Sequence, residues 1–550
     1  MFSSEFHIHL AAADIFSLCA LFASAGVLAI VVYRLHFHPL SRYPGPFWAR
    51  ITSFPSYWHT LRQDRHIWLW RLQEEYDSRP PGPTFRYRPD SILVNTPSAY
   101  AQIFSPKGNV KKGVYYKVWP REAKAVTTWN SIDPAVHSFK RRVLNHAFSS
   151  KALRSAEPFV LSNTDRWCEL LDNEVSAGAG EWSGSVNMTD WVNYLVFDIL
   201  GDLCFGKSFD MKEPNGPMRE APELMADMLA LLNPIASAPF TPLWAWLKPR
   251  GLDSLLAIAS PPPVKKWGDF VTACLTERTR AEHEAQRRLA SDPDYEVRKD
   301  FFHYLFHAQD PQTGRGFPME ELWGEAESMI IAGSDTTAIA TTAMFFYLAR
   351  KPDVQAKLAY EIRSTFRSFD DIAGGPTLYG CKYLKAFIQE TLRMAPPVGA
   401  ELDREVLKGG MVIDGEFVPE GVNVSVGHYC LNYNCEIFPD PLEFRPERWI
   451  VGEKASSPES VALAESAFCA FSAGPRGCPG KNLAWLEMMV VIAKVIYRFE
   501  VRRDFVDNLG GGSPDGRVGR RNPDQFQTYD AFVGLRHGPM VQFKRRSLLV

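Results

Sequence analysis

The sequence has no pair of cysteines in the spacing C-x-x-C, and its nine cysteines are scattered over 550 residues. Zinc sites of the usual cysteine-rich kind depend on that spacing, so we do not expect one. A disulfide framework like that of small secreted proteins needs a much higher density of cysteine. Both absences favour a reducing compartment for the main body of the chain.

The sequence also lacks a dense basic block, and its formal net charge is only -2. Proteins that bind nucleic acid usually carry such a block, so no nucleic-acid partner is expected. No internal repeat and no long linker interrupt the chain, and 46% of its residues are apolar. We therefore expect one large domain, although length alone suggests about three.

Charge is missing altogether from residues 15–33, which read IFSLCALFASAGVLAIVVY. At about 1.5 Å per residue, this segment just spans the ~30 Å hydrocarbon core of a bilayer. Glu5 and Asp14 precede the segment, and three arginines follow it, namely Arg34, Arg42 and Arg50. The excess of positive charge on the C-terminal side places the body of the protein in the cytosol.

Two alternatives to an uncleaved anchor are a cleaved signal peptide and a buried core helix. The best cleavage signal, Ala23-Ser24-Ala25, lies in the middle of the apolar run, and the first ten residues lack the positive charge of a signal peptide. We favour the anchor. It divides the chain into a tail (residues 1–14), a transmembrane anchor (15–33), a proline-rich linker (34–57) and a catalytic domain (58–550).

The predicted fold is mainly α with small β-sheets. The prolines of residues 38–50 predict a stiff, non-helical connector. Residues 85–94 and 411–426 have strand character, the latter with a tight-turn signal at Asp414-Gly415. A further strand-like pair is expected at residues 531–535 and 540–543.

The most informative stretch surrounds Cys478, in FSAGPRGCPGKNLAWLEMMVV. Glycines allow positive φ and close approach of the backbone to a large planar group. A helix is predicted directly after Gly480, and a cysteine just before a helix N-terminus is favoured as a thiolate. Arg476 can offer its planar fork to a carboxylate. A lone buried cysteine in a turn is the structural alternative, and Cys469, without flanking glycines, is such a case.

The string F-x-x-G-x-R-x-C-x-G, from Phe471 to Gly480, resembles the ligand loop of the cytochrome P450 superfamily. The resemblance implies the cytochrome P450 fold and haem b, with Cys478 as the axial ligand of the iron. Phe471 and Arg476 are then cofactor-binding residues.

Residues 320–350 predict one long helix with the string AGSDTT at its centre. Small residues there, Ala332 and Gly333, would let a planar group approach the backbone. The simplest alternative is that the hydroxyls bond back to the preceding turn. The segment is similar to the family's oxygen-activation motif, which implies that Thr336 donates a hydrogen bond to dioxygen and that Asp335 helps to relay protons.

Three shorter motifs follow the family's order. Glu390 and Arg393 match its E-x-x-R helix, and Arg448 matches its P-E-R region, in which Trp449 stands where phenylalanine is commoner. By resemblance, Glu390, Arg393 and Arg448 form a buried structural charge cluster. Three further residues would reach haem propionates, namely Arg141, His137 (in place of a family tryptophan) and Arg404.

The resemblance implies a monooxygenase that inserts one oxygen atom of O2 into a small apolar organic substrate. Electrons would come from NADPH through NADPH-cytochrome P450 reductase, and the anchor would contact lipid of the endoplasmic reticulum. The overall likeness is to fungal microsomal members, many of which act in secondary metabolism. Substrate-pocket segments are expected at residues 115–130, Ala332, 398–401 and 528–533.

Two other functions stay open at this point. One is a haem-thiolate isomerase or dehydratase that needs no external electrons, and the other is a non-catalytic haem-binding protein. The intact Asp335-Thr336 pair argues against both, because neither needs a proton relay.

Overall fold

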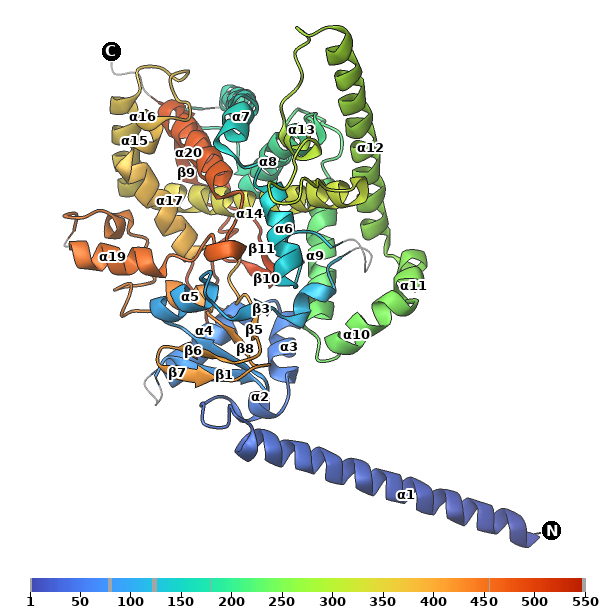
Figure 1. Ribbon diagram of the computed structural model, residues 1–550. Coiled ribbons are helices and arrows are strands. Elements are labelled where there is room, and N and C mark those ends of the chain that lie inside the picture. The colour runs from blue at the N-terminus through green and yellow to red at the C-terminus, as the bar shows by residue number, and fades with distance from the viewer. Residues whose placement is uncertain (1, 78–81, 121–125, 179, 455, 547–550) are drawn as a thin grey trace.

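The computed structural model describes residues 2–77, 82–120, 126–178, 180–454 and 456–546 (Figure 1). Residue 1 of the expected tail lies outside the described residues. So do residues 78–81, 121–125, 179, 455 and 547–550 of the expected catalytic domain. The fold is mainly α with small β-sheets, as predicted.

The α-helices are α1 (Phe2–Val32), α2 (Phe47–Ile51), α3 (Phe54–Leu61), α4 (Arg65–Tyr76), α5 (Pro97–Phe104), α6 (Pro134–Leu144), α7 (Ser150–Ala177), α8 (Met188–Phe205), α9 (Ala221–Ser237), α10 (Thr241–Leu247), α11 (Leu252–Ala259), α12 (Pro262–Ser291), α13 (Phe301–Phe306), α14 (Met319–Arg350), α15 (Pro352–Thr365), α16 (Pro376–Tyr379), α17 (Lys382–Met394), α18 (His428–Asn432), α19 (Pro458–Ala467) and α20 (Lys481–Arg498). Short turns of other helix types are η1 (Tyr33–Phe37), η2 (Val114–Lys117), η3 (Lys248–Arg250), η4 (Pro446–Trp449) and η5 (Gly474–Arg476).

The strands are β1 (Thr84–Arg88), β2 (Ser91–Val94), β3 (Val110–Lys112), β4 (Val186–Asn187), β5 (Arg404–Val406), β6 (Met411–Ile413), β7 (Glu416–Val418), β8 (Asn423–Ser425), β9 (Phe499–Arg503), β10 (Tyr529–Ala531), β11 (Val533–Leu535) and β12 (Met540–Arg545). They form a five-stranded sheet in the order β1-β2-β8-β5-β3, a three-stranded sheet β4-β12-β9 and two hairpins, β6-β7 and β10-β11.

The core is built around α14, which crosses the middle of the helical part and packs against α8, α17 and α20 (Figure 1). Its C-terminal half is buried on every side, from Thr337 to Leu348. A run of small, aliphatic and aromatic residues without charge suits such a position. Because α14 also touches α20, the helix that follows Cys478, the two main predicted motifs lie on packed neighbours.

The N-terminal helix α1 leaves the body and continues into the π-helical turn η1 (Figure 1). Residues Ile15–Phe37 are apolar enough to cross a membrane and are not buried inside the protein, a combination compatible with a membrane anchor. The second helix of sufficient apolarity among the described residues is α14, but its apolar window is 78% buried within the domain.

The prediction of a non-helical connector is wrong for its C-terminal part. Residues 38–46 are non-helical, but α2 begins at Phe47 and α3 at Phe54. Proline is compatible with the first turn of a helix, where its missing N–H has no intrahelical partner, and Pro55 occupies that position in α3. Proline therefore stiffens the non-helical residues 38–46, whereas Pro55 lies in the first turn of α3.

The strand predictions are confirmed at β1-β2 and at β6-β7. Asp414 and Gly415 both have positive φ, 48° and 83°, as a tight hairpin turn requires. The predicted pairing of residues 531–535 with 540–543 is wrong. Phe532, with a φ of 74°, reverses the chain inside the first segment, so β10 pairs with β11 while β12 pairs with β9 and β4.

The carboxylate of Glu390 collects side-chain donors from α17 and η4. Arg393 donates to both of its oxygens at 2.9 Å, and Arg448 Nε donates to Oε1 at 3.0 Å. The indole N–H of Trp449 donates to Oε2 at 2.9 Å. Burial by itself would raise the pKa of Glu390, but Arg393 and Arg448 outweigh it and hold that pKa below its usual value. Trp449 thus adds a hydrogen bond that a phenylalanine cannot make.

We expect Trp449→Phe to lower the free energy of unfolding by about 1.5–3 kcal/mol, because one hydrogen bond to a buried charge is lost while the ring is kept. Glu390→Gln should cost more, about 3–5 kcal/mol, because two buried guanidinium groups lose their counter-charge. Urea unfolding followed by circular dichroism measures both. The control Glu277→Gln removes the exposed pair with Lys207 and should change stability by about 1 kcal/mol or less. Equal stability of all three variants would contradict a stabilising role for the cluster.

Candidate functional site

Cys478 lies in a loop between α19 and α20 that is tied down at several points. Its backbone N–H donates to the carbonyl of Phe471 at 2.8 Å, and Gly477 N–H donates to the carbonyl of Gly474 at 3.0 Å. Gly474 has a φ of 62°, and a Cβ at this position would overlap the carbonyl oxygen of Phe104. Within the loop, the conformational freedom of glycine is therefore needed at Gly474, where the chain passes close to the end of α5.

The Cys478 thiol has competing electrostatic surroundings. Burial raises its pKa, while the backbone N–H groups of Gly480 and Lys481 and the charge of Arg141 lower it. The donors expected at the start of α20 are present, and they act in the predicted direction, toward the thiolate. A coordinated metal ion would add a positive charge that favours the thiolate further.

Four cationic side chains lie in or beside this loop, on α6, η5, β5 and β3. Arg141, on α6, donates to the carbonyl of Gly477 at 2.7 Å, and Arg476 donates to the carbonyls of Ser131 and Ile132. Arg404, on β5, lies opposite Lys112 of β3 in the register of the sheet. All four hydrogen-bond to backbone carbonyls.

No described carboxylate forms an ion pair with Arg141, Arg404, Arg476 or Lys112. Burial and neighbouring cations lower the pKa of Arg476 to about 10 and that of Lys112 well below its ordinary value. The same two causes lower the pKa of His137, which is buried beside them, to about 3. Buried positive charge without a counter-charge is costly. The group fits a ligand with two carboxylates, as haem has, next to the Cys478 thiol.

Lys112 is the member of this group that the sequence analysis missed. Its ammonium group lies 4.1 Å from the ring centre of Tyr116 and bonds to the carbonyl of Trp129. A lysine in a short strand carries no motif, and its proximity to Arg404 follows only from the pairing of β3 with β5. By contrast, the structure places the predicted residues Arg141, His137, Arg404 and Arg476 in one group, as their mutual electrostatic effects show.

At the centre of α14, Thr336 bonds within its own helix and Asp335 bonds to a residue outside it. The hydroxyl of Thr336 donates to the carbonyl of Ala332 at 2.6 Å, which is the back-bonding alternative. One oxygen of Asp335 accepts from Arg536 at 2.7 Å, and the other, buried Oδ2, has no hydrogen-bond partner among the described residues. Arg536 also donates to Asn193, on α8. Sequence reasoning could not find Arg536, because it follows β11 and lies far from Asp335 in the chain.

Gly333 has a different role from the predicted one. A Cβ there would come within 2.6 Å of Leu200 Cδ1, so this glycine permits α8 to pack closely against α14. Ala332, by contrast, is exposed. The side of Gly333 on which a Cβ would lie is thus occupied by α8, whereas Ala332 leaves its own side of the helix open.

A buried carboxyl group connects α14 to α20. Burial raises the pKa of Glu487 to about 8, with a hydrogen bond from Thr337 acting in the opposite direction. Its Oε1 has no described hydrogen-bond partner. Glu487 was not predicted, although it follows Cys478 on the next helix and a charged residue among Leu483, Leu486 and Met488 was a visible signal.

Three of the predicted pocket segments converge. Tyr115 and Tyr116, Ala400 and Glu401, and Asp530 and Phe532 line one cavity of about 20 Å³, with Arg65, Asn233 and Asp403. Residues 121–125 of the first segment lie outside the described part, and Ala332 is not in the lining. The rings of Tyr115, Trp119, Trp129 and Phe532 contact one another at the same place. The lining combines aromatic rings with a buried Arg65–Glu401 ion pair, so it is less apolar than expected.

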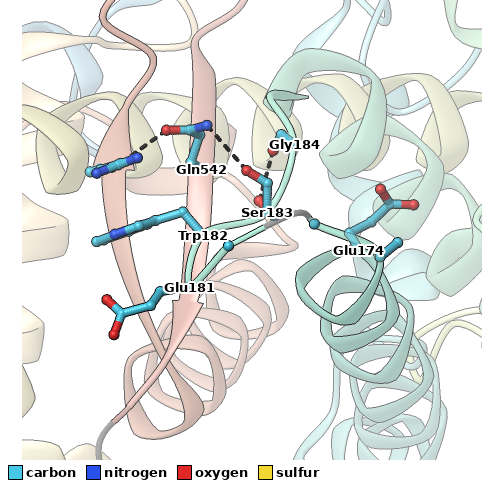
Figure 2. Close-up of a pocket in the computed structure, with 10 residues that line it drawn as sticks. Glu174, Glu181, Trp182, Ser183, Gly184 and Gln542 are labelled. Carbon is cyan, nitrogen blue, oxygen red and sulfur yellow. Dashed lines mark hydrogen bonds between the residues drawn. The ribbon is translucent and has the colours of Figure 1, made fainter.

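A larger hollow, of about 540 Å³, lies elsewhere, between the C-terminal end of α7 and strands β9 and β12 (Figure 2). Figure 2 shows the side chain of Gln542 bonded to Ser183, and Gln542 also accepts a hydrogen bond from Arg502 at 2.9 Å. None of the candidate site residues lines this hollow, and Arg502, Gln542 and Ser183 of its lining bond to one another. Its size alone does not make it the functional site.

Comparison with known proteins agrees with the geometry. The family model for cytochrome P450 matches residues 44–509. Cytochrome P450 monooxygenase apf7 of Gibberella fujikuroi is 34% identical over 95% of this chain and 97% of its own length. Cytochrome P450 monooxygenase poxM of Penicillium oxalicum is 33% identical over 95% and 94%, and cytochrome P450 monooxygenase fscF of Fusarium equiseti is 34% identical over 96% of each. The chain therefore belongs to the cytochrome P450 family, as a haem-thiolate monooxygenase that carries haem b and takes electrons from a redox partner.

Proposed function

We propose that Cys478 is the axial ligand of the haem iron and that the adjacent cationic group binds the two propionates. The observation that carries this proposal is the gathering of Arg141, Arg404, Arg476 and Lys112 next to the Cys478 loop, with no ion-paired carboxylate among the described residues. His137 and Phe471 complete the haem-binding set. Arg141 acts twice, because it also holds the loop through the carbonyl of Gly477.

When bound, the haem supplies the chemistry that activates dioxygen with electrons from the redox partner. The contribution of α14 is to supply protons. Thr336 Oγ, which donates to the Ala332 carbonyl in this structure, would turn its hydrogen toward dioxygen. Asp335 would relay protons through Oδ2, while Arg536 fixes Oδ1 and so keeps the carboxylate oriented.

The electron donor that we propose is NADPH-cytochrome P450 reductase, and the location is the membrane of the endoplasmic reticulum with the domain in the cytosol. We propose the same division as before, into a tail (1–14), an anchor (15–33), a connecting segment (34–57) and a catalytic domain (58–550). Its support is that residues Ile15–Phe37 are apolar and are not buried inside the protein. Apolar side chains are also exposed on α10 and α11 (Leu243, Trp246, Leu255 and Ile258) and on α2 and α3 (Phe47, Trp48, Phe54 and Trp58). These helices lie in the lower half of the body in Figure 1, the half from which α1 leaves, and suit contact with lipid.

The proposed substrate is a small, largely apolar organic molecule, and the proposed context is secondary metabolism in a fungus. The support is the likeness to fungal monooxygenases over nearly the whole chain and the aromatic rings of Tyr115, Trp119, Trp129 and Phe532. A shift of the haem iron from low to high spin on addition of candidate compounds would identify ligands. No observation favours an isomerase, a dehydratase or a non-catalytic haem protein.

Cys478→Ala should abolish the red-shifted Soret band of the reduced protein with carbon monoxide, because that band requires a thiolate ligand. Cys469→Ala is the matched control. Cys469 is a buried cysteine of the same stretch, 3.8 Å from Asn432 Oδ1, and its variant should keep the band. Survival of the band in Cys478→Ala, or its loss in Cys469→Ala, would contradict the assignment of the ligand.

Thr336→Ala should retain haem but divert electrons, so that a larger share of the NADPH consumed appears as hydrogen peroxide. The reason is that dioxygen loses the hydroxyl that delivers its proton. The ratio of peroxide to NADPH in the reconstituted system with reductase measures this. Thr342→Val is the control, because Thr342 is buried on the same helix and its hydroxyl has no described partner. An unchanged ratio in Thr336→Ala would argue against the relay.

Asp335→Asn should lower the rate of product formation about 10²-fold or more, the usual contribution of a positioned acid or base. It should also increase the solvent isotope effect on turnover, since proton delivery becomes slower. Arg536→Lys keeps a cation near Oδ1 and should lose less activity than Arg536→Gln. Asp335→Asn turnover equal to that of the parent would exclude Asp335 as a proton carrier.

A further inference from the structure

Two histidines and a carboxylate form a cluster at the junction of α12 and α13, on the outer side of the domain (Figure 1). Glu282 Oε1 lies 2.8 Å from Nδ1 of His303 and 3.1 Å from Nε2 of His307. The three ligand atoms all lie within 4.8 Å of one another. None of these residues belongs to the site proposed for the haem.

The cluster is built on regular elements. His303 and His307 are four positions apart, so they lie on the same face of α13 and its C-cap. The side chain of Asp300 caps this helix by accepting from His303 N–H at 2.9 Å. Glu282 faces the two imidazoles from α12 and is buried, whereas the side chain of His307 is 46% exposed. The ligand atoms are thus held from one side and reachable from the other.

The charges around the cluster favour a cation. Arg278 donates to Glu282 Oε2 at 2.8 Å, which orients the carboxylate and leaves Oε1 toward the histidines. Asp300 pairs with Arg278 and with Arg298, and Asp202 pairs with Arg298 as well. Three carboxylates therefore face two guanidinium groups. With neutral imidazoles, the cluster keeps one negative charge.

We propose that Glu282, His303 and His307 bind a divalent transition-metal ion, with Zn²⁺ as the best match. Two imidazoles and one carboxylate are a common set of protein ligands for zinc, whereas calcium and magnesium prefer oxygen alone. Bonds of about 2.0–2.2 Å in a tetrahedron separate ligand atoms by roughly 3.3–3.6 Å. The observed separations, 2.8 Å to His303 and 3.1 Å to His307, need a small outward movement of both imidazoles.

A fourth position lies on the open side of the cluster. The amide of Gln286 is 3.2 Å from His307 Nε2. Its oxygen and nitrogen exchange places by rotation about the side chain, so either this oxygen or a water molecule can complete the tetrahedron. The lack of C-x-x-C pairs excludes cysteine-rich zinc sites and has no bearing on this ligand set.

The test uses the full-length holoprotein without an affinity tag, freed of loose metal by dialysis against a chelator and titrated with ZnCl₂. Bound zinc per haem is measured by elemental analysis, and the zinc ligands by X-ray absorption at the zinc edge, where the haem iron does not contribute. We expect one zinc per haem with nitrogen and oxygen ligands. A bound ion that links α12 to α13 should also raise the thermal midpoint as zinc increases.

His307→Ala and His303→Ala should each weaken zinc binding at least tenfold and remove the thermal shift. His307 is the cleaner position, because its side chain is partly exposed and its loss should not disturb the fold. His283→Ala is the matched control. It removes the neighbouring histidine of α12, which contacts the ring of Phe306 at 5.3 Å and lies outside the cluster. Retained haem and carbon monoxide spectra show that each variant is folded.

Binding of less than one zinc per haem at saturation would overturn the proposal. So would affinity that is unchanged in a His303→Ala/His307→Ala double variant, because the zinc would then be bound elsewhere. In either case, the cluster is a carboxylate that accepts hydrogen bonds from two imidazoles.

Discussion

The cost of placing charge in the protein interior is the constraint on which most of this structure depends. A buried ion is tolerated when an opposite charge and hydrogen bonds replace the water that it has lost. The Glu390 cluster meets that condition, since its carboxylate receives donors from Arg393, Arg448 and Trp449. The cluster beside Cys478 does not, since Arg476 and Lys112 have backbone carbonyls in place of carboxylates. This contrast separates a group that stabilises the fold from the group that we propose binds the haem propionates.

The same reasoning applies to single atoms within one side chain. Asp335 has one oxygen held by Arg536 and one buried oxygen that has no partner in the part of the chain that the structure describes. A carboxylate paired at both oxygens would be held too tightly to exchange a proton, and one paired at neither would not keep its orientation. Glu487 is also only partly compensated, and its raised pKa of about 8 means that it carries a proton at neutral pH. Both groups lie on the packed pair α14 and α20.

The parts of the site that could be predicted are those that lie within one short string. The string from Phe471 to Gly480, the pair Asp335-Thr336 and the residues Glu390 and Arg393 each occupy one turn or one loop. Their neighbours in space could not be predicted in the same way. Arg536, which directly follows β11, donates to Asp335 because of where the hairpin β10-β11 lies in the fold. Lys112 lies beside Arg404 because the three-residue strands β3 and β5 pair in that register. Such contacts depend on the whole topology. Gly333 is a case in which a residue type is ambiguous. A small residue in α14 can admit a cofactor or a neighbouring helix, and only the structure shows that Gly333 lies against Leu200 of α8.

The long-range pairs also bear on how a substrate can reach the haem. The cavity shared by Tyr115, Glu401 and Phe532 measures only about 20 Å³, far below the 300–1,000 Å³ of ordinary ligand pockets. Binding of the proposed substrate between these rings requires the side chains to move. The aromatic rings can separate at a cost of about 0.5–1.5 kcal/mol for each contact, whereas Arg65 and Glu401 are buried together and would each need a new partner. The aromatic contacts are therefore the cheaper ones to open, and the Arg65–Glu401 ion pair is the costlier one to break.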